Sequence, residues 1–267
     1  MDFVVSFTSH FQRAHFIEVA INELRNQTLL PKIVEINLPS GFDFSLSNKF
    51  YSFPAHIEIN RVEDYGPATK LLPALLRYPE LPIITIDDDA HYRPELFEDL
   101  VSFSLAFPGR RVAARARLIP PGRRPWLIPY LFWPKIMLAQ PVVESRALPL
   151  GAEGVLYPPG SVEDSVWDID TMMRTSPKND DLWFWNHGEK RSPGVVVLPY
   201  QSDSPRRLGS KESGLWQSNR GRKNNIALKN LVKNYPPNTN GVRSRISFTR
   251  QLLANLMEEV PRKLNVS

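Results

Sequence analysis

The sequence contains no cysteine among its 267 residues. This absence excludes disulfide bonds, thiolate nucleophiles, cysteine-ligated zinc and iron–sulfur clusters. No run of about 18 apolar residues occurs, so no membrane-spanning helix is predicted. The first residues also lack the basic segment and the apolar stretch of a signal peptide. We therefore expect a cytoplasmic protein, either freely soluble or peripheral at the inner face of a membrane.

The net charge of the chain is also small. Lysine and arginine number 33 against 28 acidic residues, which gives a net charge of +5. This excess favours an anionic ligand but is too small to indicate nucleic acid. Hydrophobic residues make up 42% of the chain, an ordinary globular share that excludes wholesale disorder.

The first half of the chain alternates predicted strands and helices. Short apolar or alternating runs predict strands at Phe3–Phe7, Ile33–Leu38, His56–Val62, Pro82–Ile86 and Arg111–Ala116. Helical spacing predicts helices from Arg13, over Pro67–Arg77 and over Pro94–Phe107, and Pro73 should kink or shorten the second one. This alternation predicts an α/β fold with a mostly parallel sheet flanked by helices.

The second half is less regular. Weak strands are predicted near Leu148–Leu156 and Val195–Leu198, and helices from Asp180, near Asn224–Asn234 and near Ser244–Glu259. The segment Arg206–Lys223 is basic and rich in glycine and serine, so it is predicted to be a mobile loop. We accordingly divide the chain into a main domain, residues 1–205, and a loop with C-terminal helices, residues 206–267.

Three consecutive acids follow a strand of buried character. Ile83–Ile86 leads directly into Asp87, Asp88 and Asp89. In open α/β sheets the ligand crevice lies at the carboxyl ends of the strands, and carboxylates suit Mg²⁺ or Mn²⁺ shared with substrate phosphates. In an extended chain Asp87 and Asp89 would project to one side and Asp88 to the other. The alternative is that Asp88 or Asp89 only caps the helix that follows Pro94.

Two further strand ends carry polar residues. The run from Glu63 to Lys70 ends a strand, turns at Gly-Pro and begins a helix, whose N-terminus and lysine favour anions. The alternative there is a solvated cap with an exposed lysine. Thr8 and Ser9 place small hydroxyl groups after the first strand.

Together these segments resemble the nucleotide-sugar-binding half of the GT-A glycosyltransferases, in their short family-2-like bacterial branch that builds surface polysaccharides. The resemblance rests on VVSFTSHFQRAHFIEVAINELRNQTLLPKIVEINLP at residues 4–39, EDYGPATKL at residues 63–71 and IITIDDD at residues 83–89, which matches the acidic D-x-D motif. It covers residues 1–105 and, in patches, Gly151–Pro159 and Asn179–His187.

The resemblance implies a nucleotide-sugar-binding half at residues 1–105 and an acceptor-side half at residues 106–205. It implies Mn²⁺ or Mg²⁺ held by Asp89 and Asp87 against the donor diphosphate. The implied donor-binding residues are Thr8, Ser9, Asp64, Lys70, Asp87 and Asp88. The segment Gly151–Gly154 either lets the backbone approach the donor sugar or forms a plain turn.

On the acceptor side the resemblance implies a catalytic aspartate or glutamate in the helix that starts at Asp180. Asp180 is a plausible N-cap, which leaves Asp181 as the general base for the acceptor hydroxyl, with inversion. The alternative is that both acids only cap and solvate the helix. Trp183 and Trp185 either stack on a sugar or belong to the core. His187 is a candidate third metal ligand.

The leading hypothesis is a metal-dependent, hexosyl-transferring enzyme that moves a sugar from a nucleotide-sugar donor to a glycan or lipid-linked acceptor. One alternative is another metal-dependent enzyme of phosphate chemistry, such as a nucleotidyltransferase or phosphohydrolase. A non-catalytic carbohydrate-binding protein is the other. We expect no nucleic-acid partner, because the basic residues of Arg206–Lys223 suit a loop closing over a diphosphate.

The segment Pro125–Leu138 is unusually rich in aromatic residues and follows several arginines. Its prolines exclude a spanning helix. One hypothesis is that it contacts an anionic membrane surface near a lipid-linked acceptor. The alternative is a loop folded over the sheet, with Trp126 and Trp133 in the core or in an acceptor subsite.

Overall fold

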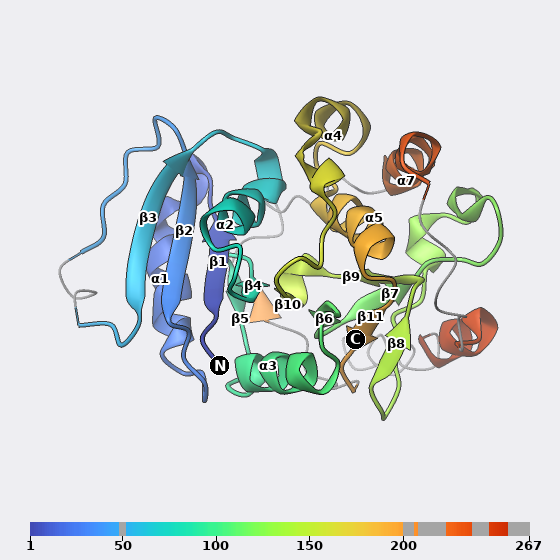
Figure 1. Ribbon diagram of the computed structural model, residues 1–267, viewed down its shortest axis with the longest axis horizontal. Helices are drawn as coiled ribbons and strands as arrows, with labels where there is room; N and C mark the ends of the chain where they lie inside the picture. Colours follow the sequence, from blue (N-terminus) through green and yellow to red (C-terminus); the bar gives the residue numbers. More distant parts are fainter. Residues whose placement is uncertain (48–51, 200–205, 208–222, 237–245, 256–267) are drawn as a thin grey trace, which may run out of the picture.

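The computed structural model describes residues 1–47, 52–199, 206–207, 223–236 and 246–255 (Figure 1). Within these residues, the largest sheet has eight strands in the order β3-β2-β1-β4-β10-β6-β11-β8. Its strands are β1 Val4–Thr8, β2 Ile33–Pro39, β3 His56–Val62, β4 Ile83–Thr85, β6 Val112–Ala113, β8 Val142–Glu144, β10 Val155–Tyr157 and β11 Val195–Val197. Two small sheets pair β5 Ala90–His91 with β12 Arg206–Arg207, and β7 Ala116–Leu118 with β9 Ala147–Pro149.

The first four strands of the sheet run parallel. β1 pairs in parallel with both β2 and β4, in a register that aligns Val4 with Ile33 and Ile83, and β2 pairs in parallel with β3. Their carboxyl ends therefore meet at one edge. β10 then runs antiparallel between β4 and β6, and β6 pairs in parallel with β11. The α/β class with a mostly parallel sheet is confirmed.

Helices cover both faces of this sheet. The α-helices are α1 Ala14–Leu24, α2 Leu72–Arg77, α3 Leu96–Ala106, α4 Ile169–Thr175, α5 Asp180–Arg191 and α7 Lys223–Asn234. Side chains alternate along β1, so Val5 packs in one core with α1 and α3, while Val4 packs in a second core with α2, α5 and α7. Burial on both faces explains the mostly apolar character of β1 and β4, whereas β2 also buries Glu35 and Asn37.

Two predicted strands are divided in the structure. The run Arg111–Ala116 splits into β6 and β7, which belong to different sheets. The run Leu148–Leu156 splits into β9 and β10 around the 3₁₀ turn η6, Gly151–Glu153. Gly154 ends that turn with a φ of 100°, a backbone conformation that side chains disfavour. The prediction of one strand was wrong in both places because turn geometry interrupts an apolar run.

The predicted helix Pro67–Arg77 is also divided, into the 3₁₀ helix η3, Gly66–Lys70, and α2. Pro73 lies in the first turn of α2, which agrees with the expected shortening. The helix α4 follows η7, Asp164–Trp167, and was not predicted. Asp168 caps α4, its side chain accepting a hydrogen bond from Thr171 N–H at 3.1 Å.

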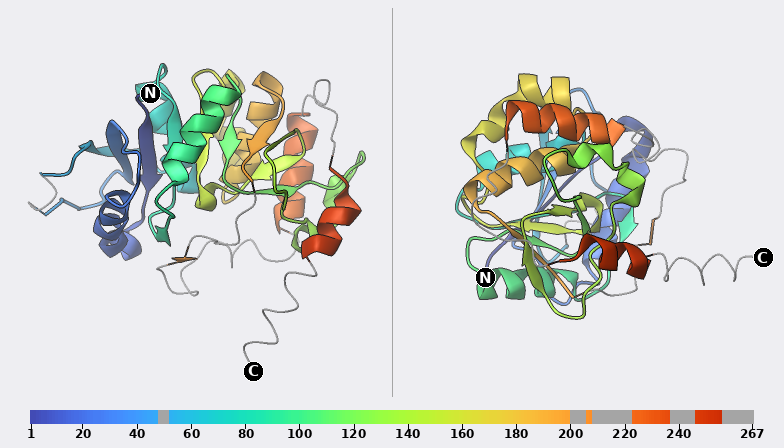
Figure 2. Two further views of the ribbon diagram at one scale, coloured as in Figure 1. Left: turned by 90° about the horizontal axis from the view of Figure 1, so that it is seen from below. Right: turned by 90° about the vertical axis from the view of Figure 1, so that its right-hand side faces the viewer.

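At the C-terminal side, α7 matches the helix predicted at Asn224–Asn234, and residues 248–255 are helical within the predicted Ser244–Glu259. Both lie at the end of the molecule opposite β3 (Figure 2). Apart from β12 and Lys223, the predicted loop Arg206–Lys223 lies outside the described residues, and the division at residue 205 stays a prediction. None of the helices in the described part of the chain has the length and apolar character of a membrane span.

Candidate active site

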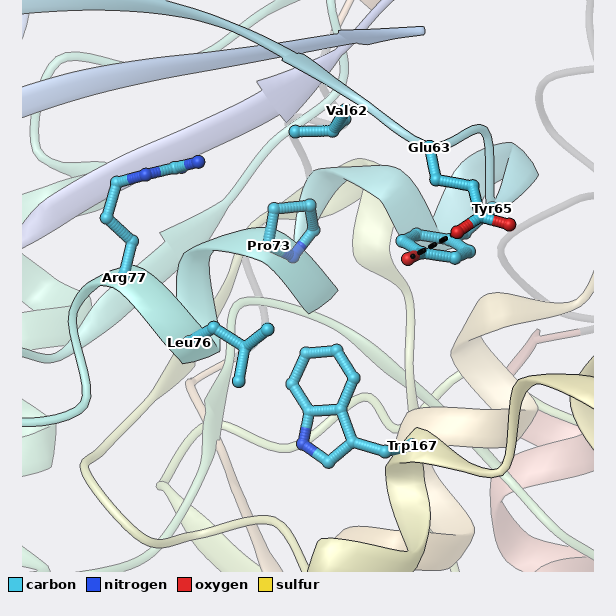
Figure 3. Close-up of a pocket in the computed structure, with 7 residues that line it drawn as sticks. All are labelled: Val62, Glu63, Tyr65, Pro73, Leu76, Arg77 and Trp167. Carbon is cyan, nitrogen blue, oxygen red and sulfur yellow. Dashed lines mark hydrogen bonds between the residues drawn. The ribbon is translucent and has the colours of Figure 1, made fainter. Parts of the chain in front are cut away.

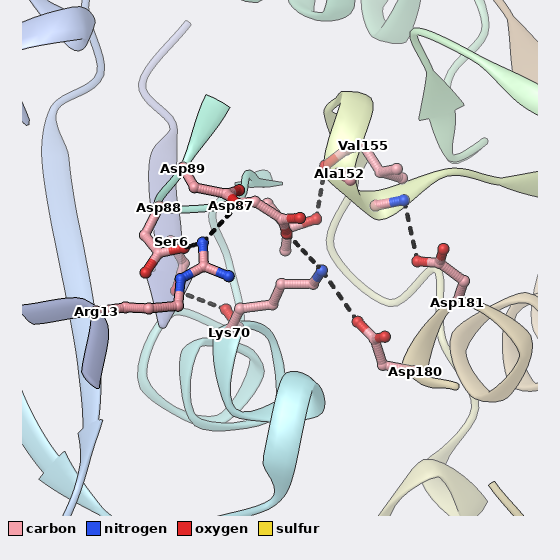
Figure 4. Close-up of polar contacts among 12 residues, drawn as sticks. Ser6, Arg13, Lys70, Asp87, Asp88, Asp89, Ala152, Val155, Asp180 and Asp181 are labelled. Carbon is pink, nitrogen blue, oxygen red and sulfur yellow. Dashed lines mark hydrogen bonds and ion pairs between the residues drawn. The ribbon is translucent and has the colours of Figure 1, made fainter. Parts of the chain in front are cut away.

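The three acids after β4 lie at the carboxyl edge of the parallel strands (Figure 4). The chain turns at Asp88 and Asp89 instead of staying extended, so the expected alternation of the three side chains was wrong. Asp88 and Asp89 share one partner, Arg13, whereas Asp87 contacts Lys70. The helix α3 has Glu95 at its N-cap position, which rules out Asp88 or Asp89 as its cap.

Arg13 contacts the acidic edge and is a residue of the candidate site that the sequence analysis missed. It ends the 3₁₀ helix η1, Phe11–Arg13, directly after β1, and β1 lies beside β4. Its guanidinium group pairs with Asp88 and lies 2.8 Å from Asp89 Oδ2. Ser9, also after β1, donates a hydrogen bond to Asp88 Oδ2 at 2.6 Å. Burial raises the pKa of Asp88 to about 7, although the charge of Arg13 opposes the shift.

Lys70 joins the acidic edge to the start of α5. Its buried Nζ lies 3.1 Å from Asp87 Oδ1 and 3.0 Å from Asp180 Oδ2. Burial acts to lower the pKa of Lys70, but the charges of the surrounding carboxylates outweigh it and raise that pKa well above its ordinary value. Lys70 is the last residue of a five-residue 3₁₀ helix. Because its side chain is buried, the alternative of an exposed lysine at a solvated cap is excluded.

Asp181 faces this cluster from the start of α5. The N-cap residue of α5 is Asn179, so the prediction of Asp180 as N-cap was wrong, and the Asp180 side chain pairs with Lys70 instead. Asp181 Oδ1 accepts a hydrogen bond from Gly151 N–H at 3.0 Å. Burial, with the neighbouring Asp180 charge as the next cause, raises the pKa of Asp181 to about 7. The pKa of Asp181 is therefore shifted towards neutral pH, the direction that favours proton transfer by a carboxylate.

A side chain at position 151 would disturb this contact. A Cβ atom at position 151 would lie 2.6 Å from Asp181 Oδ1 and 2.9 Å from Lys70 Nζ. The neighbouring backbone is fixed by Tyr92, whose hydroxyl donates to Ala152 O at 3.2 Å and accepts from Asp87 N–H at 2.9 Å. The turn at η6 thus brings the backbone close to two catalytic candidates and ties it to the acidic edge.

The other predicted donor-binding residues lie at neighbouring strand ends. Thr8 ends β1 and donates a hydrogen bond to Asn37 O at 2.7 Å. Asp64 follows β3, is exposed, and accepts a hydrogen bond from Gly66 N–H at 2.8 Å. Strand β2 separates these two strands, so Asp64 stands about two strand spacings, or ~10 Å, along the edge from Thr8. The predicted residues thus line one continuous edge.

The structure does not bring His187 to this edge. His187 lies seven residues along α5 from Asp180, an axial rise of about 10 Å. Its ring packs 4.1 Å from the Trp183 ring, and its Nδ1 shares a hydrogen bond of 2.8 Å with Ser165 Oγ. Burial lowers the pKa of His187 to about 4, so the ring is neutral. Trp183 and Trp185 are buried in the core, which excludes the sugar-stacking alternative.

The acids after β4 suit a divalent cation in their chemistry, since they supply the hard oxygen atoms that Mg²⁺ and Mn²⁺ prefer. Side-chain exposure is 29% for Asp87, 12% for Asp89 and 6% for Asp88. In the described ranges, no three acids or histidines converge into a metal site made by the protein alone. One or two carboxylates suffice when substrate phosphates complete the shell, so the residues present fit an ion shared with a diphosphate.

A separate cavity of about 400 Å³ lies between α2 and η7 (Figure 3). Its walls are formed by residues of the β3 end, of α2 and of η7: Val62, Glu63, Tyr65, Pro73, Leu76, Arg77 and Trp167. The Tyr65 hydroxyl donates to Glu63 at 3.1 Å, and Arg77 pairs with the buried Glu35. No predicted site residue lines this cavity, so the acidic edge remains the candidate site.

No protein-family model matches this chain, and no curated protein matches it by sequence. Among solved structures, residues 1–349 of TarS from S. aureus align with 96% of this chain and 71% of that chain, at 13% identity and a TM-score of 0.51. The same TarS fragment in complex with UDP aligns over the same shares at 14% identity and a TM-score of 0.53. TarS is a glycosyltransferase. The chain therefore shares the α/β fold of TarS.

Proposed function

We propose that the chain is a glycosyltransferase that moves a sugar from a nucleotide-sugar donor to a hydroxyl group of a glycan or lipid-linked acceptor. The observation that carries this proposal is the position of Asp181. It faces the acidic edge across Lys70, and its pKa of about 7 suits a base. The likeness of the fold to TarS adds support, although a shared fold does not by itself imply a shared function.

For the donor, we propose that the nucleotide binds at the carboxyl edge of β1, β3 and β4. Thr8, Ser9 and Asp64 lie along that edge, and one of the similar TarS structures contains UDP. Asp87 and Asp89 would hold Mn²⁺ or Mg²⁺ against the diphosphate. The bound ion would supply Lewis acidity toward the departing phosphate. Asp88, which is buried between Ser9 and Arg13, would support the edge and not touch the ion.

For the acceptor, we propose that Asp181 is the general base. The acceptor hydroxyl would give its proton to this carboxylate while its oxygen bonds to the anomeric carbon and the bond from that carbon to the diphosphate breaks. Attack opposite the leaving group inverts the configuration. Gly151 N–H and the nearby Lys70 would hold the Asp181 carboxylate in place. Asp180 would act as a positioning residue through Lys70.

Calorimetric titration with UDP tests the donor half of this proposal. We expect binding that requires Mn²⁺ or Mg²⁺ and that loses its metal-dependent part in Asp89→Asn. The exposed Asp170 on α4 provides a matched control, because Asp170→Asn removes a carboxylate far from the acidic edge. Equal affinity with Mn²⁺ and with a chelator would refute metal dependence.

Product analysis separates the proposed function from its alternatives. Transfer of a sugar releases a free nucleoside diphosphate, whereas a nucleotidyltransferase releases pyrophosphate and a phosphohydrolase releases phosphate. Metal-dependent binding of a nucleotide sugar without turnover would instead indicate a non-catalytic carbohydrate-binding protein. The raised pKa of Asp181 favours catalysis, since a binding protein has no use for a buried base.

The segment Pro125–Leu138 would contact a membrane if the enzyme uses a lipid-linked acceptor in surface polysaccharide synthesis. Trp133 anchors this segment in the core, its indole donating to Ile128 O at 2.9 Å, which confirms the core alternative for that residue. The 3₁₀ helices η4, Pro125–Leu127, and η5, Tyr130–Phe132, leave large apolar side chains exposed. Exposed Arg123 and Arg124 precede them and complement anionic lipid.

Sedimentation with anionic liposomes tests this contact. Leu131 is 79% exposed, and replacing it and Phe132 by serine should abolish binding without disturbing the core. Leu105 on α3 is 60% exposed and distant from the segment, so Leu105→Ser is the control. Absence of binding at low salt, or equal loss in both variants, would reject the membrane contact.

A further inference from the structure

Arg13 occupies the place where a cation at the acidic edge would bind. Its guanidinium group pairs with Asp88 and lies 2.8 Å from Asp89 Oδ2 (Figure 4). The residue is only 9% exposed, although it stands beside a proposed ligand site. One positive charge thus holds two adjacent carboxylates that would otherwise repel each other.

The hydrogen bonds of Arg13 are incomplete in this arrangement. Its Nε is buried and has no hydrogen-bond partner. Buried donors are normally paired, and an unpaired one indicates strain or a missing partner. A guanidinium group binds phosphate oxygens through two parallel N–H donors as readily as it binds a carboxylate. Arg13 therefore has one unpaired donor and belongs to the side-chain type that binds phosphate through two donors.

We propose that Arg13 is an internal counter-cation that a divalent metal must displace from Asp89 and that then binds the donor diphosphate. Arg13 keeps its pair with the more buried Asp88 and exchanges only the contact with Asp89. This inference rests on the proposed function. It deepens that function by making metal binding and nucleotide binding depend on each other through one side chain of the protein.

The exchange has a thermodynamic consequence. With Arg13 on Asp89, metal binding alone must break an ion pair and bring two positive charges together, so it is weak. A diphosphate gives Arg13 a new anionic partner and leaves the Asp89 carboxylate to the metal. Each ligand therefore strengthens the binding of the other by the same factor, as linkage requires.

Electron paramagnetic resonance of Mn²⁺, which reports free and bound ion without turnover, tests the proposal. In Arg13→Met we expect Mn²⁺ to bind about tenfold or more tightly in the absence of nucleotide, because a unit positive charge beside the ion is gone. UDP in the presence of saturating Mn²⁺ should bind about tenfold more weakly, because its guanidinium partner is lost. Arg13→Lys keeps the positive charge but loses the paired N–H donors of the guanidinium group. This variant should bind metal with an intermediate affinity.

The control is Arg25→Met, which removes an exposed arginine at the end of α1 and should change neither affinity. Thermal unfolding verifies that each variant folds, and Arg13→Lys provides the test if Arg13→Met does not. Unchanged Mn²⁺ affinity in a folded Arg13 variant overturns the inference and leaves the proposed function in place. Failure of every protein to bind Mn²⁺, with or without UDP, overturns the proposed metal site and the inference with it.

Discussion

Replacing Gly151 by alanine perturbs the candidate base without touching its own side chain. The added Cβ would lie 2.6 Å from Asp181 Oδ1, whereas an ordinary contact begins at 3.4 Å. The carboxylate must therefore move by about 0.8 Å, unless the η6 backbone moves instead. Lys70 Nζ, at 2.9 Å from the same Cβ, blocks the other direction.

The expected loss is large in rate and modest in stability. A misplacement of about 1 Å in a catalytic group can cost about 10²-fold in rate, so we expect Gly151→Ala to lower kcat by that order. Overpacking of this kind typically costs about 1–3 kcal/mol in the free energy of unfolding. The KM for the donor should change little, because Asp181 acts on the acceptor proton.

Steady-state kinetics with a nucleotide-sugar donor and thermal unfolding measure both effects. The control is Ala152→Ser, which adds an atom one residue away at a half-buried position. Wild-type kcat in a folded Gly151→Ala protein, together with wild-type kcat in Asp181→Asn, would refute the assignment of Asp181 as the base. Loss of donor binding instead of turnover would place Gly151 at the donor.

Three other outcomes are expected. Burial raises the pKa of Asp181, so turnover should rise with pH through neutrality to a plateau, and Asp181→Asn should lower kcat on that plateau by about 10²-fold or more and remove the rise. Lys70→Met should lower the free energy of unfolding in urea by about 3 kcal/mol at neutral pH, since buried carboxylates lose their counter-charge, and by less at acid pH, where they take up protons. Gly188→Ala should destabilise the protein by about 3 kcal/mol in the same assay, because the new Cβ would lie 2.1 Å from the guanidinium group of Arg111, which is paired with buried Glu189.

The parts of the fold that could be predicted are those with a local signal. Strands β1 and β4 are mostly apolar runs that end at polar residues, β2 alternates apolar and polar residues before Pro39, and α1 and α3 repeat apolar residues at helical spacing. The acidic edge was found for the same reason, since a buried strand leads directly into charge.

The remaining parts depend on contacts between distant residues. Arg13 meets Asp88 across 75 positions of the chain, and Gly151 meets Asp181 across 30. No local pattern marks either contact. A signal for Arg13 did exist, because it follows β1 and parallel neighbours end at the same edge as β4. The division of β6 from β7 had no such signal, since neither glycine nor proline stands at the break, where the residues are Ala114 and Arg115.

A crystal structure of the protein with UDP and Mn²⁺ tests most directly whether the edge formed by β1, β3 and β4 is a donor site. We expect Mn²⁺ on Asp87 and Asp89 with the diphosphate beside it, Arg13 turned from Asp89 to the phosphate, and Asp181 on the far side of the space left for the sugar. Nucleotide bound elsewhere, such as in the cavity between α2 and η7, with the ion pairs of Arg13 and Lys70 intact, would contradict the proposed site.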